Sequence, residues 1–279
     1  MTAKKKGESN MKKILSFGLI GLLALFLAAC GNDKSAALAN DKILVGVSGG
    51  PHEQVMEKVK ELAADEGIDV EIKTFNDYNT PNSALDDGSL DANSYQTLPF
   101  LEDQVKNQGY ELKEVFKTLT FPMGIYTDKI SDISELKEGD KIAVPNDPAN
   151  EYRALKLFET AGVLKVDPEA ENSATAKDVV ENPLNLEIVE LDASQLPAQL
   201  PEVAAAAINT NFAMGADLNI NDDAIFAEES ENNPWSNYFV VRSANTDDEV
   251  VKKIQEIYQS DEVKQFVEDE FQGSVVPSW

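Results

Sequence analysis

The chain alternates short apolar segments with segments in which apolar residues recur every three or four positions. Residues 43–47 form an apolar run typical of a buried strand, whereas residues 70–75 alternate and predict a strand with one wet face. The stretch from Pro51, ended by Gly67, has one apolar face and predicts a helix. Further strands are predicted at 90–95, 112–118, 124–126, 141–145, 186–191, 203–208 and 239–241, and further helical segments at 81–87, 98–107, 134–139, 150–161, 250–257 and 263–271.

These repeated strand–helix units predict an α/β fold of mostly parallel sheets with flanking helices. The apolar fraction of 42% is ordinary for a globular protein. The residues that follow position 29 suffice for one large domain or for two modest lobes. Because ligands of such folds bind outside the carboxyl ends of strands, functional side chains are expected in the strand-to-helix loops.

The first 29 residues have the layout of a secretory signal peptide. A basic start after Met11 precedes an apolar run at 14–27 and two alanines. That run is shorter than the about 20 apolar residues that favour a spanning helix. Residues 1–10 are either an upstream extension or part of this leader.

Cys30 is the only cysteine, so no intrachain disulfide is expected. In Leu-Ala-Ala-Cys-Gly at 27–31 it looks like the lipid-modified cysteine of a bacterial lipobox; the alternative is a cysteine that happens to end a leader. Residues 30–41 then form the lipidated cysteine and a flexible tether. The prediction is a protein anchored by lipid on the extracytoplasmic face of the cell membrane.

The charge excludes several partners. The chain has a net charge of −26, and its first 29 residues carry +4, which leaves −30 on the remainder. So acidic a protein repels nucleic acid and anionic lipid headgroups. Membrane attachment therefore has to come from the lipid, and the two acyl chains of a diacylglyceryl group anchor far better than one.

Catalytic and metal-binding patterns are scarce. His52, the only histidine, is interpreted as a loop or cap residue, and neither a histidine metal site nor a G-x-S-x-G elbow is predicted. Ser48-Gly49-Gly50 lacks the full fingerprint of a dinucleotide or phosphate loop. The acidic stretch 217–223 is interpreted as a solvated loop and not as a calcium site. We expect no cofactor and no catalytic residue.

Arg153 is the basic residue placed best for binding. It follows a strand and a proline-rich turn, on a helix that Asn150 is predicted to cap. A guanidinium at this position can hold a carboxylate with two parallel hydrogen bonds. The alternative is an ion pair with one of the many acidic residues. The other arginine, Arg242, is interpreted as a surface residue at a strand end.

From Lys42 to Trp279 the chain resembles the NlpA/MetQ family, the methionine-binding lipoproteins of ABC importers. The segments that carry the resemblance are Phe75–Tyr78, Pro81-Asn82, Leu90–Asn93, Pro99–Leu101, Val144–Pro148, Asn150-Glu151, Arg153–Leu155, Glu181–Pro183, Ile188–Leu191, Ile208-Asn209, Asn233–Asn237 and Val275–Trp279. Their number and order make the resemblance specific, and the lipobox agrees with it independently.

The resemblance implies a two-lobed fold of the periplasmic-binding-protein kind with a cleft between the lobes. Residues 42–120 plus 235–279 would form one lobe, and residues 121–234 the other. The implied partners are an amino acid, with L-methionine first, and importer permease subunits served by a cytoplasmic ATPase. The protein is expected to act as a monomer.

The resemblance also implies a binding site. Arg153 would hold the ligand carboxylate, and Asn209 and Asn237 would bind the ammonium and the carboxylate. Tyr78, Tyr95 and Phe100 would line the side-chain pocket, where a thioether packs well against aromatic rings. Four of these residues also have structural alternatives: Tyr78 and Phe100 as ordinary core aromatics, and Asn209 and Asn237 as turn or cap residues.

Thr97 departs from the family pattern. Where the family commonly has Phe-Gln-His, this chain has Tyr95-Gln96-Thr97. The hydroxyl of Thr97 leaves more room than a histidine and changes the hydrogen-bonding groups. The ligand could therefore be another amino acid, a D-isomer or a methionyl dipeptide.

Two other functional classes stay open. A lipoprotein hydrolase could use paired carboxylates, which the 50 acidic residues neither support nor exclude. A surface adhesin would present an exposed apolar patch and no ligand pocket.

Overall fold

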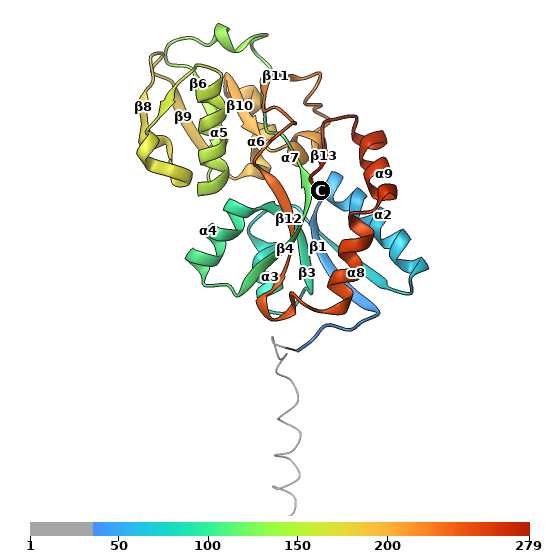
Figure 1. Ribbon diagram of the computed structural model, residues 1–279. Helices are drawn as coiled ribbons and strands as arrows, with labels where there is room; N and C mark the ends of the chain where they lie inside the picture. Colours follow the sequence, from blue (N-terminus) through green and yellow to red (C-terminus); the bar gives the residue numbers. More distant parts are fainter. Residues whose placement is uncertain (1–35) are drawn as a thin grey trace, which may run out of the picture. The chain divides into compact units, whose positions relative to one another are not determined.

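The computed structural model describes residues 36–279, apart from the side chains of residues 171–173. The predicted signal peptide, Cys30 and the first part of the tether lie outside the described residues. Within residues 36–279, no helix has both the length and the apolar character needed to cross a bilayer. This part of the chain forms two main sheets with helices packed on them (Figure 1).

The first sheet combines the beginning and the end of the described chain. Its strands are β1 (Lys42–Ser48), β2 (Asp69–Phe75), β3 (Ala92–Thr97), β4 (Leu112–Thr120), β12 (Ser236–Arg242) and β13 (Val276–Pro277). They lie in the order β13-β4-β12-β3-β1-β2. β1 pairs in parallel with β2 and β3, and β12 lies antiparallel between β3 and β4.

The second sheet comes from the middle of the chain. Its strands are β5 (Gly124–Tyr126), β6 (Lys141–Pro145), β9 (Glu187–Leu191), β10 (Ala205–Ile208) and β11 (Ala224–Ala227). They lie in the order β11-β5-β10-β6-β9. β6 is parallel to β9 and β10, and β5 is antiparallel to β10 and β11. A separate two-stranded ribbon joins β7 (Lys165–Val166) and β8 (Val179–Glu181).

Helices cover both faces of each sheet. The helices are α2 (Pro51–Asp65), α3 (Thr80–Asp86), α4 (Leu98–Gln108), α5 (Pro148–Thr160), α6 (Leu196–Gln199), α7 (Thr210–Gly215), α8 (Glu249–Tyr258) and α9 (Asp261–Phe271). Short 3₁₀ turns lie at Ile133–Glu135, Pro168–Ser173, Ala176–Asp178, Ala193–Gln195, Leu200–Glu202 and Ser243–Asn245. We call the first sheet with α2, α3, α4, α8 and α9 the first lobe, and the second sheet with α5, α6 and α7 the second lobe.

Alternation along the strands explains this layering, because successive residues of a strand point to opposite faces. On β12, Val241 packs in the cluster that holds α2, α8 and α9, while Val240 packs with α3 and α4. On β10, Ala205 lies in the cluster with α5, and Ala206 in the cluster with α6 and α7. β10 is buried on both faces, and its three alanines leave room for helices to approach closely on each side.

The α/β prediction with two lobes is confirmed, but the sheets are mixed rather than mostly parallel. Within the two main sheets, the antiparallel pairings all involve β5, β11, β12, β13 and their neighbours, which lie next to the connections between the sheets. Periodicity reveals that a segment is a strand but not its direction. The parallel expectation therefore held only for the strands that helices connect.

Two segments, 121–123 and 228–235, carry the chain between the sheets, and we call them the crossing segments. They lie side by side at both ends. Ala227 pairs with Gly124 on β5, and Ser236 pairs with Thr120 on β4. The backbone of Glu228 also donates a hydrogen bond to that of Met123, from Glu228 N to Met123 O at 2.9 Å.

The interpretation of Arg242 as a surface residue was wrong. Its side chain is buried, with 8% exposure for the residue, and Nη1 donates to the carbonyl oxygens of Leu90 (2.5 Å) and Leu85 (3.0 Å). Nε donates to Asn245 Oδ1 at 3.1 Å. The guanidinium thus satisfies one backbone carbonyl in the last turn of α3 and one just before β3, both more than 150 residues away in sequence. Short-range patterns carry no sign of this.

We expect Arg242→Met to lower the free energy of unfolding by about 2–4 kcal/mol, because buried carbonyls lose their donors while the side-chain volume is kept. Urea unfolding of the purified protein measures it. Lys113→Met, at an exposed position on the neighbouring β4, is the matched control and should change stability by less than about 0.5 kcal/mol. Equal stability of the two variants would contradict the structural role of Arg242.

Candidate functional site

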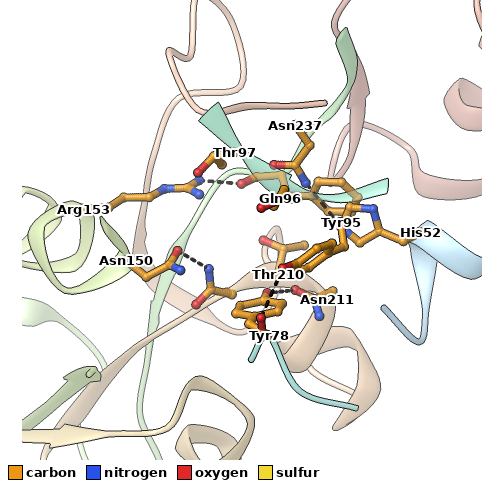
Figure 2. Close-up of a pocket in the computed structure, with 12 residues that line it drawn as sticks. His52, Tyr78, Tyr95, Gln96, Thr97, Asn150, Arg153, Thr210, Asn211 and Asn237 are labelled. Carbon is orange, nitrogen blue, oxygen red and sulfur yellow. Dashed lines mark hydrogen bonds between the residues drawn. The ribbon is translucent and has the colours of Figure 1, made fainter. Parts of the chain in front are cut away.

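A cavity lies between the two lobes, next to the crossing segments. Its empty volume, including the part that opens to solvent, is about 370 Å³. Polar side chains from both lobes converge on it (Figure 2). Six of the seven residues predicted for ligand binding line it: Tyr78, Tyr95, Thr97, Arg153, Asn209 and Asn237. Phe100 does not line it but packs against Tyr95 with ring centroids 6.0 Å apart.

The start of α5 positions Arg153. Asp147, and not Asn150 as predicted, caps this helix, because its carboxylate accepts from Asn150 N at 2.9 Å. Pro148 then occupies the first helical turn, where its missing N–H costs nothing. Arg153 follows one and a half turns into α5 and is 4% exposed. Burial raises the pKa of the Asp147 carboxyl to about 6, although hydrogen bonds from Asn150 oppose this.

Arg153 is held by an acidic partner. Nε donates to Glu228 Oε1 at 2.8 Å, and Nη2 donates to Glu228 Oε2 and to the carbonyl of Phe121, both at 2.6 Å. The guanidinium also lies 5.2 Å from the ring of Trp235. The ion pair that the sequence left as an alternative is therefore present. Among the described residues, however, Nη1 has no hydrogen-bond acceptor, and Figure 2 shows the guanidinium directed into the cavity.

Asn209 offers a free acceptor to the cavity. Its Nδ2 donates to Asn150 Oδ1 at 2.9 Å, and Asn150 Nδ2 in turn donates to both carboxylate oxygens of Asp147 at 3.0 Å. This chain fixes the orientation of the Asn209 amide. Its Oδ1 is then buried without a partner among residues 36–279. A buried acceptor without a donor is costly, so this oxygen is a natural partner for an N–H group of a ligand.

His52 is a cavity residue that the sequence interpretation missed. Gly50, at φ 85°, turns the chain into Pro51 and places His52 in the first turn of α2. Its ring is 3% exposed and stacks on Phe121 with centroids 4.1 Å apart. Asn237 Nδ2 lies 3.3 Å from His52 Nε2. The position of His52 just beyond a predicted buried strand was the available signal, since ligands bind at such ends.

Burial lowers the pKa of His52 to about 3, so the imidazole is neutral at physiological pH. As the pH falls below 6.5, the unfolded chain takes up a proton that the folded chain refuses, and stability decreases. Between pH 7 and pH 5 this effect should cost the wild type about 2 kcal/mol relative to His52→Gln, which has no such proton. Chemical denaturation of both proteins at the two pH values measures it.

The same comparison also cancels the contributions that two carboxyl groups at the start of α5, Asp147 and Glu151, make to the pH dependence of stability. Burial raises the pKa of Asp147 to about 6 and of Glu151 to about 7, so both contribute in the opposite direction. They are present in wild type and variant alike and cancel in the difference. Parallel pH profiles for the two proteins would show that His52 is not buried in its neutral form.

Two tyrosine rings of the first lobe, Tyr78 and Tyr95, form one wall of the cavity. Tyr78 lies between Tyr95 of the first lobe, at 5.9 Å, and Phe212 of the second, at 4.7 Å between ring centroids. The hydroxyl of Tyr78 donates to Asn211 Oδ1, and that of Tyr95 donates to the backbone oxygen of Tyr78 at 3.2 Å. Burial raises the pKa of both phenols, so they stay protonated donors.

Thr97 and a buried amide network form the floor. Thr97 is the N-cap residue of α4 and pairs with Asn237 across β3 and β12. Beside it, Gln96 lines the cavity and exchanges hydrogen bonds of 2.7 and 2.8 Å with Asn82, while its Nε2 also donates to Asn93 Oδ1 at 2.8 Å. This satisfied network fixes β3 and therefore the side chains of Tyr95 and Thr97.

Within the described residues, no group of histidine, cysteine and carboxylate side chains is arranged to hold a metal ion. The cavity instead combines one compensated cation, neutral amides, hydroxyls and aromatic rings. Such a set can enclose a small solute that carries a carboxylate, an ammonium and an apolar side chain. Two α/β lobes that enclose such a cavity beside two crossing segments define the class of two-lobed solute-binding proteins.

Comparison with known proteins identifies the family. Residues 43–279 match the NlpA lipoprotein family. The chain is 43% identical over 256 residues to the probable D-methionine-binding lipoprotein MetQ of Vibrio cholerae, covering 91% of this chain and 94% of that protein. It is 42% identical to D-methionine-binding lipoprotein MetQ of Escherichia coli K12, covering 96% and 99%. The chain therefore belongs to the NlpA lipoprotein family, and the resemblance inferred from its motifs is confirmed.

Solved structures agree with this assignment. A nutrient-binding protein from Burkholderia cenocepacia, bound to methionine, is 46% identical and superimposes with a TM-score of 0.83. The superposition covers 85% of this chain and all of that one. The two-lobed fold is thereby confirmed.

Proposed function

We propose that this protein binds methionine, or a closely related amino acid or short peptide, between its lobes and delivers it to an ABC importer. The observation that carries the proposal is the interlobe cavity, where Arg153 Nη1 and the unpaired Asn209 Oδ1 face a wall of aromatic rings. The names of its relatives, which describe D-methionine-binding lipoproteins and a methionine-bound structure, support the same ligand class.

Each part of a zwitterionic amino acid has a partner of matching chemistry. The carboxylate accepts from Arg153, the ammonium donates to Asn209, and Asn237 adds an amide beside them. The thioether packs among Tyr78, Tyr95 and, behind it, Phe100, since sulfur interacts favourably with ring edges. Pairing both charges offsets the cost of removing them from water.

Thr97 and Tyr95 set the choice among related ligands. The short Thr97 leaves space where the family commonly carries a histidine, and Tyr95 adds a phenol to the wall. This combination keeps a D-isomer, a methionyl dipeptide and another amino acid within the proposal. Methionine is the first choice because the aromatic wall suits an apolar, polarisable side chain.

Lobe closure provides the signal to the importer. We expect residues 42–120 plus 235–279 and residues 121–234 to move as two bodies about the crossing segments, with ligand contacts from both favouring the closed form. Contacts across the cleft, such as Tyr78 to Asn211 and Asn79 Nδ2 to Asp192 Oδ2 at 3.3 Å, support a closed arrangement. The permease and its cytoplasmic ATPase would then read the closed surface.

We further propose that the protein acts as a monomer, that Cys30 carries the lipid, and that it performs no catalysis. Among residues 36–279, Val180 is the single exposed large apolar side chain. These residues therefore present no contiguous apolar patch of the kind that an adhesin would use for docking. The compensated, largely neutral cavity likewise supports binding over hydrolysis by paired carboxylates.

Uptake of labelled methionine at low concentration by cells with and without this protein tests the proposal. We expect uptake to fall when the protein is absent and to return with the wild-type gene, but not with Cys30→Ser, because that variant lacks the lipid anchor. Unchanged uptake of methionine, its D-isomer and a methionyl dipeptide in the deletion strain would reject the transport role.

A further inference from the structure

Glu228 lies directly behind Arg153 and is the most heavily hydrogen-bonded carboxylate near the cavity. Oε1 accepts from Arg153 Nε, and Oε2 accepts from Arg153 Nη2, from Met123 N at 2.9 Å and from Asn233 Nδ2 at 3.0 Å. Its side chain is 12% exposed. Burial alone would raise the pKa of Glu228, but the charge of Arg153 and these hydrogen bonds hold the pKa below its ordinary value.

The position of Glu228 in the fold fixes this arrangement. It is the first residue after β11 and begins the second crossing segment, while Met123 ends the first. One carboxylate therefore joins both crossing segments to α5. It occupies Nε and Nη2 of Arg153 and leaves Nη1, among the described residues, as the donor available to a solute.

Glu228 also determines the net charge of the cleft. Arg153 brings one positive charge into a buried site, and Glu228 cancels it at hydrogen-bonding distance. His52 is neutral, and Asp147, whose carboxylate accepts from Asn150, does not line the cavity. An arginine without an acidic partner would favour any anionic solute. An arginine whose charge is already cancelled favours a solute whose own charges sum to zero, because the net charge of an anion would then be buried in the closed cleft without a counter-charge.

We propose that Glu228 is the residue that makes the cleft selective for zwitterionic over anionic solutes, by cancelling the charge of Arg153 and by directing Nη1 toward the solute carboxylate. The inference rests on the proposed function and adds the charge class of its ligand. Glu228 acts through Arg153, so it is a positioning and charge-balancing residue that does not itself contact the solute.

Two variants separate charge from position. Glu228→Gln keeps the length and an acceptor oxygen but removes the charge, whereas Glu228→Asp keeps the charge but cannot reach all four donors. Glu229→Gln removes the same charge from an exposed neighbouring position and is the matched control. The ligands are L-methionine and desamino-methionine, an anion with the same thioether chain and no ammonium, so that no added bulk confuses the comparison.

We measure the ratio of the two dissociation constants by calorimetric titration of the full chain, stripped of ligand and refolded. In wild type and Glu229→Gln, methionine should be preferred by about a hundredfold or more. In Glu228→Gln that preference should fall at least about tenfold, because the anion now meets an uncompensated cation. Glu228→Asp should bind both ligands more weakly while keeping the wild-type ratio.

An unchanged ratio in Glu228→Gln, or a ratio that falls equally in Glu228→Asp, would overturn the inference and leave the proposed function standing. Absence of methionine binding in the wild type would instead reject the proposed function, and the inference with it. Should Glu228→Gln fail to fold, comparable wild-type affinities for the two ligands, or a lowered ratio in Glu228→Asp, would still overturn the inference.

Discussion

Replacement of Arg153 by alanine is expected to weaken methionine binding by about a hundredfold or more, because a buried ligand carboxylate loses its charged donor. The same change leaves the buried Glu228 without its counter-charge. Breaking one partner of a buried ion pair costs about 3–5 kcal/mol, so the variant should also unfold more easily in the absence of ligand. One substitution thus tests both the contact of the guanidinium with the ligand carboxylate and its ion pair with Glu228.

Calorimetric titration measures the affinity, and denaturant unfolding of the ligand-free protein measures the stability. Lys156→Ala is the control on the same helix, since the Lys156 side chain is 42% exposed and pairs only with Glu159 among described carboxylates. This control should bind methionine as the wild type does. Near-normal affinity in Arg153→Ala would show that the ligand carboxylate lies elsewhere.

Replacement of Asn209 by alanine is expected to reduce methionine affinity about 10–100-fold. Its Oδ1 is buried without a partner among residues 36–279, so the proposed ammonium contact satisfies an otherwise costly acceptor. Removing the amide deletes that contact and leaves the ligand ammonium short of one acceptor. The stability of the ligand-free protein should change little, because the lost bond to Asn150 is offset by removal of the unsatisfied oxygen.

The test pairs affinity with ligand-free stability. Asn221→Ala, in an exposed loop of the second lobe, is the matched amide control and should leave both unchanged. If Asn209→Ala bound methionine as tightly as the wild type, the ammonium would have to be placed against other neutral groups that line the cavity, such as Asn237 or a tyrosine hydroxyl.

Local patterns predicted much of the fold. The apolar stripe that includes Val250, Ile254 and Ile257 predicted α8, and the run 141–145 coincides with β6. These succeed because periodicity reports which face of an element is buried. The helix α7 at 210–215, which is shorter than two turns, and the strand β11 at 224–227 were missed.

The partners of the buried polar residues could not be predicted from local sequence. Arg153 was predicted because its strand, turn and helix are contiguous in sequence, and the family resemblance supplied its role. Its partner Glu228 lies 75 residues away, and Arg242 finds its carbonyl acceptors more than 150 residues away. Such partners are fixed by the meeting of the two sheets and of their connections, which no window of sequence contains.

The predictions for the cap of α5 and for the position of His52 were wrong for a related reason. Asp147 and Asn150 are both good cap residues, and only the backbone geometry decides that Asp147 takes this position and frees Asn150 to orient Asn209. His52 was judged by its flanking glycines and proline, which describe a turn but not the cavity at the end of β1.

The most direct test of the account is a calorimetric titration of the unfolded, ligand-stripped and refolded protein with L-methionine, run beside Arg153→Ala. The account predicts saturable binding at one site per chain in the wild type, and loss of that binding in the variant. Failure of the wild type to bind methionine, its D-isomer, a methionyl dipeptide or any other amino acid would contradict it.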